Sequence, residues 1–252
     1  MMSHKKNQKL NFCRRDDHCK AYKLWQTLLS EKTIAREGPS TMLRPNPGRG
    51  LLFATLLLAL TSATHAQGVL DEWNSVKAPP PPPLHNVTLN PKTTALFMMD
   101  FNSKNCKPEL RNRCAAIMPN VEKFLKRARS ANLTIVHSYT PNMEESDIVL
   151  NVKPLPTERV VQVRGDKFDR NDLSETLKSK GITTIITVGT SANGAVLFTA
   201  IGASQRGFKV VVPVDAMPAD TAYQEQFSIW EIANGPTIRE VSTLTTLDRI
   251  TF

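Results

Sequence analysis

The sequence contains few of the residues and patterns that mark several large classes of protein. Histidine occurs five times in 252 residues and cysteine four times. After residue 66 the chain carries 21 lysines and arginines against 19 aspartates and glutamates, a net charge of +2. A nucleic-acid-binding surface needs a concentration of positive charge, which this balance does not support. We therefore expect no nucleic-acid partner for this part of the chain.

Long hydrophobic runs are also scarce. The apolar run LLFATLLLALTSA covers residues 51–63 and is too short to span a bilayer comfortably as a helix. Basic residues precede it, and small residues follow it up to Ala66, which is typical of a secretory signal peptide. We predict a signal peptide over 42–66, cleaved after Ala66, and a secreted or periplasmic protein. The alternative is an uncleaved membrane anchor, so we expect membrane contact only through this segment.

The segments on either side of this signal have no pattern of a folded domain. Residues 1–41 are polar and basic, and they stand where a signal peptide should begin the chain. Either translation starts at Met42 or this extension is a genuine cytosolic tail. Residues 67–91 contain five consecutive prolines at 79–83, which favour an extended polyproline II linker.

From residue 92 to residue 252, apolar strand patterns alternate with helical patterns, which predicts one α/β domain. The predicted strands are 94–100, 133–139, 160–163, 183–188, 208–214 and 239–243. The predicted helices are 118 or 119 to 132, 172–180, a stretch that begins at 192 or 193, and 221–234. Because the strands are almost continuously apolar, we expect a mostly parallel, doubly wound sheet with helices on both faces, in three layers.

Ligands of such sheets bind at the carboxyl ends of the strands. This rule selects Asp100, the segment 137–140, the segment 190–195 and Asp215. In the stretch 183–203, a buried strand leads through a tight turn into a small-residue helix. Several backbone N–H groups then point at one place, which suits an anion or an oxyanion.

This stretch resembles the nucleophile turn of the isochorismatase-like cysteine hydrolases. In that family a strand ends in a small-residue turn, and a catalytic cysteine begins the next helix. Gly189 matches the strand end, Asn193 a frequent asparagine, and Thr199 with Ala200 the usual pair that follows the cysteine. Ala195 falls at the position of the cysteine. The resemblance covers roughly 94–250 and implies a hydrolase fold with the nucleophilic sulfur absent.

Two further family elements are present in part. Asp100 is followed by Phe101 and Asn102, as the general base of the family is followed by a hydrophobic residue and an amide. The resemblance implies that Asp100 is catalytic, and a loop-capping aspartate is the alternative.

The family also has a lysine ahead of a phenylalanine. Phe168 fits that phenylalanine, but Gln162 stands at the usual place of the lysine. Lys167 and Arg164 are the nearby cations, and we name Lys167 as the partner of Asp100. The alternative is a solvated surface lysine.

Ala195 offers no nucleophile, acid or base, which excludes thiolate catalysis at that position. The hydroxyl groups of Thr190 and Ser191 have no visible histidine partner. The backbone donors of 191–195 remain able to bind a small ligand. The residues that we expect to contact such a ligand are Asn102, His137, Phe168, Thr190, Ser191, Asn193 and Gly194.

The loop 101–114 contains no histidine, whereas some family members bind zinc there, so we expect no metal and no cofactor. For His137, a structural hydrogen bond is the alternative to ligand contact. Cys106 and Cys114 are the only cysteines after the signal, and an oxidising compartment favours a disulfide between them. Two free thiols are the alternative.

Three functions remain open for the domain. The first is hydrolysis of a small amide, ester or enol ether, with Asp100 activating water. The second is binding of a small carboxylate or amide without catalysis. The third is a structural or interaction role, in which the domain assembles into a homo-oligomer through the helices that flank the sheet.

Overall fold

The structure is a computed structural model that describes residues 68–252 of the chain. The predicted extension at 1–41 and the predicted signal peptide at 42–66 lie outside the described residues. The chain divides into two units, Met1–Ser75 and Val76–Phe252. The described part of the first unit contains the short helix α2 (Val69–Glu72). Within residues 68–252, no helix combines the length and the apolar character that a membrane crossing requires.

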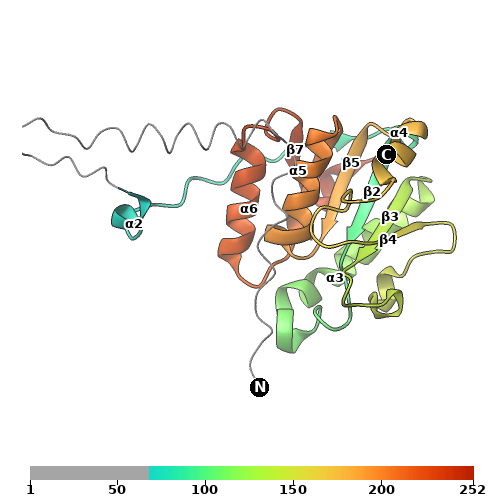
Figure 1. Ribbon diagram of the computed structural model, residues 1–252, viewed down its shortest axis with the longest axis horizontal. Coiled ribbons are helices and arrows are strands. Elements are labelled where there is room, and N and C mark those ends of the chain that lie inside the picture. Colours follow the sequence, from blue (N-terminus) through green and yellow to red (C-terminus); the bar gives the residue numbers. More distant parts are fainter. Residues whose placement is uncertain (1–67) are drawn as a thin grey trace, which may run out of the picture. The chain divides into compact units, whose positions relative to one another are not determined.

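Six parallel strands form the sheet of the second unit (Figure 1). They are β2 (Thr94–Met99), β3 (Thr134–Tyr139), β4 (Arg159–Gln162), β5 (Thr184–Gly189), β6 (Lys209–Pro213) and β7 (Ser242–Thr245). The strand order is β4-β3-β2-β5-β6-β7, so the chain winds outward from β2 in one direction and from β5 in the other. Every residue of β2 and β5 is buried. Their carboxyl ends form the switch point at which such sheets bind ligands.

Helices cover both faces of the sheet. On one face, α3 (Pro108–Ser130) buries Val121 and Leu125 against Met98 and Ile186 of the central strands. On the other face lie α4 (Leu173–Ser179), α5 (Leu197–Gln205) and α6 (Ala222–Asn234). Their apolar residues share one core with the opposite side chains of β2 and β5. Figure 1 shows α5 and α6 next to each other on this face. The predicted three-layer, doubly wound α/β fold is confirmed.

The predicted start of α3 is wrong by about ten residues. The helix begins at Pro108, and Pro119 lies inside it. Proline fits the first position of a helix because its missing N–H would have no partner there. Cys114 and Met118 extend the buried stripe of the helix toward its start. The sequence prediction placed the helix start at the wrong proline.

The last strand of the sheet also differs from its prediction. Residues 239–241 belong to a turn, in which the Val241 N–H donates to the Ile238 carbonyl at 3.1 Å, and β7 begins only at Ser242.

Two short strands were not predicted: β1 (Val87–Thr88) pairs in parallel with β8 (Ile250–Thr251). The His85 N–H also donates to the Leu244 carbonyl at 2.9 Å. The end of the predicted linker 67–91 is therefore bonded to the folded unit.

Candidate active site

Asp100 is the first residue after β2, at the switch point of the sheet. Its φ of 56° lies in the left-handed region, which aspartate tolerates better than most residues. The side chain is almost buried, and both carboxylate oxygens are bonded. Oδ1 accepts from the Ser138 hydroxyl at 2.8 Å, and Oδ2 accepts from the Lys167 ammonium at 2.8 Å. Two neighbouring elements therefore fix the orientation of this carboxylate.

Lys167 is fully buried and forms hydrogen bonds to three segments of the chain. Its Nζ donates to the Val163 carbonyl at 2.7 Å as well as to Asp100. Its backbone N–H donates to the Thr199 hydroxyl on α5 at 3.2 Å. Burial lowers the pKa of Lys167 below its ordinary value, and the charge and hydrogen bond of Asp100 oppose that effect. Of the two cations considered from the sequence, Lys167 is the one bonded to Asp100.

The turn after β5 lies directly beside Asp100. Thr190 donates its N–H to the carbonyl of Met99, the residue before Asp100, at 3.0 Å. Gly189 allows this approach, because a β-carbon there would lie 2.5 Å from both the Cβ and the carbonyl oxygen of Met99. The Thr190–Ser191 peptide bond is cis. A π-helical turn, Ala192–Val196, then leads into α5.

Comparisons with known proteins identify the family of this fold. The family model described as "Isochorismatase domain" matches residues 94–246, which is more than half of the chain. The chain belongs to the isochorismatase family.

Among curated proteins, the chain is similar to a secreted isochorismatase effector, Isc1, from Verticillium dahliae. The two are 28% identical over 142 residues, which cover 52% of this chain and 75% of that protein.

Solved structures of the isochorismatase family share the fold. An isochorismatase family protein from Desulfovibrio vulgaris superposes with a TM-score of 0.55 at 20% identity, covering 62% of this chain and 95% of that one. A cysteine hydrolase from Pseudomonas syringae pv. phaseolicola superposes with a TM-score of 0.56 at 20% identity, covering 66% and 94%. At these identities the likeness concerns the fold.

The residues expected from the isochorismatase resemblance to contact a ligand separate into two groups. Four of them form the turn itself: Thr190, Ser191, Asn193 and Gly194. Ala195 lies in the same turn and is 6% exposed. A β-carbon on Gly194 would lie 2.9 Å from the Ser191 hydroxyl, so the two residues are closely packed.

The other three expected contact residues have structural partners. Asn102 is buried; it donates to the Asp100 carbonyl at 3.2 Å and accepts from the Asn105 N–H at 2.8 Å, so it holds the loop after Asp100. Phe168 stacks on Phe208 in the core, with ring centroids 5.7 Å apart.

His137 points away from Asp100, because adjacent residues of a strand face opposite sides and the neighbouring Ser138 faces Asp100. The Nε2 of His137 lies 2.8 Å from the Glu158 carboxylate. Burial alone would raise the pKa of Glu158, but hydrogen bonds from Arg129, His137 and the Leu155 N–H outweigh it and hold the pKa at about 2. This geometry agrees with a structural hydrogen bond for His137 rather than with ligand contact.

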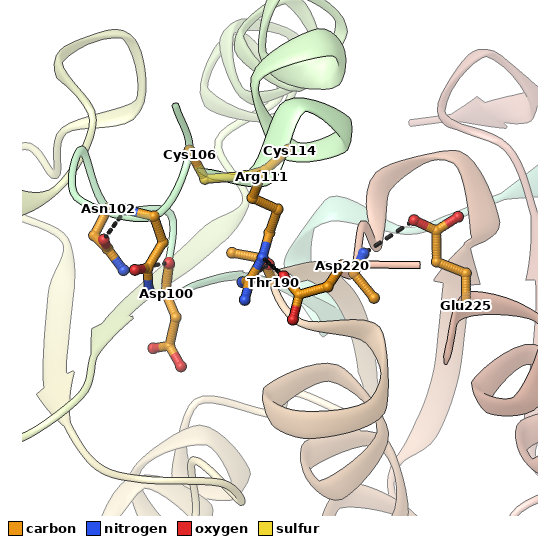
Figure 2. The surroundings of a disulfide bond; sticks show 10 residues. Asp100, Asn102, Cys106, Arg111, Cys114, Thr190, Asp220 and Glu225 are labelled. Carbon is orange, nitrogen blue, oxygen red and sulfur yellow. Dashed lines mark hydrogen bonds and ion pairs between the residues drawn. A yellow bond between two sulfur atoms is a disulfide. The ribbon is translucent and has the colours of Figure 1, made fainter. Parts of the chain in front are cut away.

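Ser138 lies in the predicted segment 137–140 but was not named as a site residue, and the sequence analysis missed Arg111 and Asp220. The Arg111 Nη1 donates to the Thr190 hydroxyl at 2.7 Å, and its Nε donates to the Asp220 carboxylate at 2.6 Å. A disulfide between Cys106 and Cys114 brackets Arg111 in the chain (Figure 2). The predicted cysteine pair was the one signal in the sequence that could have pointed to Arg111.

Within residues 68–252, no group of three or more histidine, cysteine, aspartate or glutamate side chains is placed to hold a metal ion. The site therefore consists of a buried acid–base pair, a turn with backbone donors, and an arginine. Such a set can move a proton and can stabilise negative charge on a small ligand.

Proposed function

We propose that this protein is an exported hydrolase that cleaves a small amide, ester or enol-ether carboxylate without forming a covalent intermediate. The observation that carries the proposal is the buried pair of Asp100 and Lys167 beside the 190–195 turn. A buried ion pair adds little or no stability compared with well-packed apolar residues, so stability alone does not explain why these two residues are present. Export is supported by the signal-like segment 42–66 and by the similarity to a secreted effector.

Because Ala195 has no nucleophilic group, water is the nucleophile in either reaction that the Asp100–Lys167 pair could drive. For an amide or an ester, Asp100 would take a proton from water while the water oxygen attacks the carbonyl carbon. The N–H groups of Ser191, Asn193 and Ala195 would stabilise the resulting oxyanion, because those of Thr190, Ala192 and Gly194 already donate to backbone carbonyl groups. Collapse of the oxyanion would expel the amine or alcohol, which would take the proton held by Asp100. For an enol ether, Asp100 in its protonated form would deliver its proton to the terminal vinyl carbon. Water would then add to the oxygen-bearing carbon and give one proton back to the Asp100 carboxylate. The resulting hemiketal would break its bond to the ether oxygen and separate into a carbonyl compound and an alcohol. Neither route needs a nucleophilic side chain, so Ala195 is compatible with both.

Ligand binding without turnover is the second candidate. Ala195 supports it as well, and so does the state of Asp100, whose two carboxylate oxygens are both already bonded. In this case Asp100 and the turn would recognise a small carboxylate or amide, and no bond would be broken.

The test compares the wild-type protein with Asp100→Asn and Ala195→Cys on an enol-ether carboxylate and on an aromatic amide, with products quantified by chromatography. We expect wild-type turnover of the enol ether and a loss of at least about 100-fold in kcat for Asp100→Asn, the scale of general acid–base catalysis. Asp248→Asn is the matched control, because that aspartate is exposed and bonds only locally within its turn.

The outcomes separate the candidates. Activity that survives in Asp100→Asn removes Asp100 from the mechanism and refutes the proposal. An inactive wild type that gains amide turnover as Ala195→Cys supports the binding function, because the rest of the site is then competent. If neither protein turns over substrate and no small ligand shifts the melting temperature, the structural or interaction role remains.

A further inference from the structure

Arg111 has an unusual position at the start of α3. Its backbone angles, φ −135° and ψ 76°, are non-helical and produce a kink inside the helix. The side chain is 18% exposed, which is low for an arginine outside the core. In Figure 2 it runs from α3 toward Thr190, with Asp100 on one side in this view and Asp220 on the other. The kink therefore directs a positive charge at the turn beside Asp100.

The bonds of Arg111 hold its guanidinium and leave part of it available. Nε donates to Asp220 and Nη1 donates to Thr190. Nη2 donates to no residue of the described part of the chain. A guanidinium has five N–H groups in a planar fork, and two neighbouring nitrogens can bind one carboxylate through two parallel hydrogen bonds. The Nη1–Nη2 edge of Arg111 is suited to that interaction.

The charges around the turn make Arg111 the cation best placed to meet an anionic ligand. Lys167 is fully buried and is already paired with Asp100. Asp220, the partner of Arg111, is 55% exposed, so water weakens its hold on the guanidinium charge. Thr190, which Arg111 contacts, belongs to the turn that supplies the backbone donors of the site.

We propose that Arg111 is a specificity-determining residue that binds the carboxylate group of the ligand through its Nη1–Nη2 edge, while Thr190 and Asp220 hold the guanidinium in place. The site then selects small carboxylates over the corresponding neutral amides. This inference rests on the proposed function only in assuming that the ligand occupies the turn beside Asp100; it does not require turnover. The Cys106–Cys114 disulfide joins the chain on both sides of Arg111 and restricts how far that residue can move.

The chain offers a matched control two residues away. Arg113 also lies on the first turns of α3 and also pairs with a carboxylate, that of Glu225. It has no hydrogen bond to the 190–195 turn in the described residues. A general loss of positive charge from this end of α3 would therefore affect Arg111→Met and Arg113→Met alike, whereas carboxylate binding would depend on Arg111.

The experiment measures the dissociation constants of benzoate and benzamide, and of pyruvate and pyruvamide, by isothermal titration calorimetry on the wild-type chain and on variants. We expect the wild type to bind at least one carboxylate more tightly than its amide. Arg111→Met should weaken that carboxylate by about 10- to 100-fold, the scale of charged hydrogen bonds, and change the amide by less than about twofold. Arg113→Met should change neither. Arg111→Lys keeps the charge without the fork, so its affinity should fall between the wild type and Arg111→Met.

Three results would overturn the inference: a wild type that prefers no carboxylate over its amide, an Arg111→Met variant that binds the carboxylate as the wild type does, or an equal loss in both arginine variants. The outcome is independent of the hydrolase proposal. Selective carboxylate binding through Arg111 in a protein without turnover would leave this inference standing and refute hydrolysis. Turnover of neutral substrates that depends on Asp100 but not on Arg111 would do the reverse.

Discussion

Replacing Lys167 by methionine tests whether the site is held together by a buried charge pair. The Lys167 ammonium lies 2.8 Å from the Asp100 carboxylate, and the two side chains are 0% and 9% exposed. Methionine fills a similar volume but leaves the carboxylate buried without its cation, and water cannot replace that partner without opening the core. Breaking such a pair costs about 3–5 kcal/mol of the free energy of unfolding. For a domain of this size the melting temperature should fall by about 6–20 °C.

The assay is urea unfolding followed by circular dichroism, together with thermal unfolding. Lys126→Met is the control. It also removes a lysine from an ion pair, that with Glu122 at 2.6 Å, but this lysine is 70% exposed, so the loss of stability should be much smaller than for Lys167→Met. The double variant Asp100→Asn/Lys167→Met should recover at least about 1 kcal/mol, because the uncompensated charge is gone. If Lys167→Met alone lowers the free energy of unfolding by less than about 1 kcal/mol, the reasoning is refuted. The Asp100 carboxylate would then be hydrated in the absence of Lys167, and the pair would not be needed to hold the site.

Two further predictions concern the sheet. Gly189→Ala should lower the free energy of unfolding by about 3 kcal/mol, because the new β-carbon would lie 2.5 Å from the carbonyl oxygen of Met99 in β2 and would separate the two central strands. Urea unfolding measures this change, and a loss below about 1 kcal/mol would contradict the prediction. Glu158 has a pKa of about 2 in the folded protein against 4.5 as its ordinary value, so between those values the unfolded state binds more protons and stability falls as the pH falls. Glu158→Gln should therefore be less stable than the wild type by at most about 3 kcal/mol above pH 4.5. Unfolding curves from pH 6 to pH 3 should show this difference in stability shrinking as the pH falls. A difference that stays constant would contradict the low pKa of Glu158.

The sequence predicted the layers of the fold well because buried parallel strands are almost uninterrupted apolar runs. β2 and β5 are of this kind. The helix α6 was predicted to within a residue from its amphipathic pattern and from Gly235, and the structure adds a capping box at Thr221. The start of α3 failed because two prolines both fit a helix start, and only packing shows that Pro119 lies inside the helix. β1 and β8 could not be found, because two-residue strands have no periodicity to detect.

A site residue could be predicted when it is a polar residue at the end of a predicted strand. Contacts between segments that are far apart in the sequence could not be predicted. Asp100 lies at a strand end, which a sequence can show. The bond from Ser138 depends on the register of β3 against β2, and the bond from Arg111 to Thr190 spans 79 residues of chain. His137 was expected to contact a ligand because it lies near the end of a strand, but it faces away from Asp100 and bonds Glu158. The sequence does not show which side of the sheet such a residue faces.

The pairing of β1 with β8 also sets an order of events in synthesis. Thr88 meets a partner that lies 163 residues later in the chain, and β2 waits for β5, which begins 90 residues after β2 begins. A ribosome delivers the chain from its amino end, so the central pairing of the sheet cannot close until more than half of the domain has been made. β1 stays unpaired until residues 250–251 have been made. Strands β2, β3 and β4 can pair earlier, so the sheet grows from one half and receives its central β2–β5 contact later.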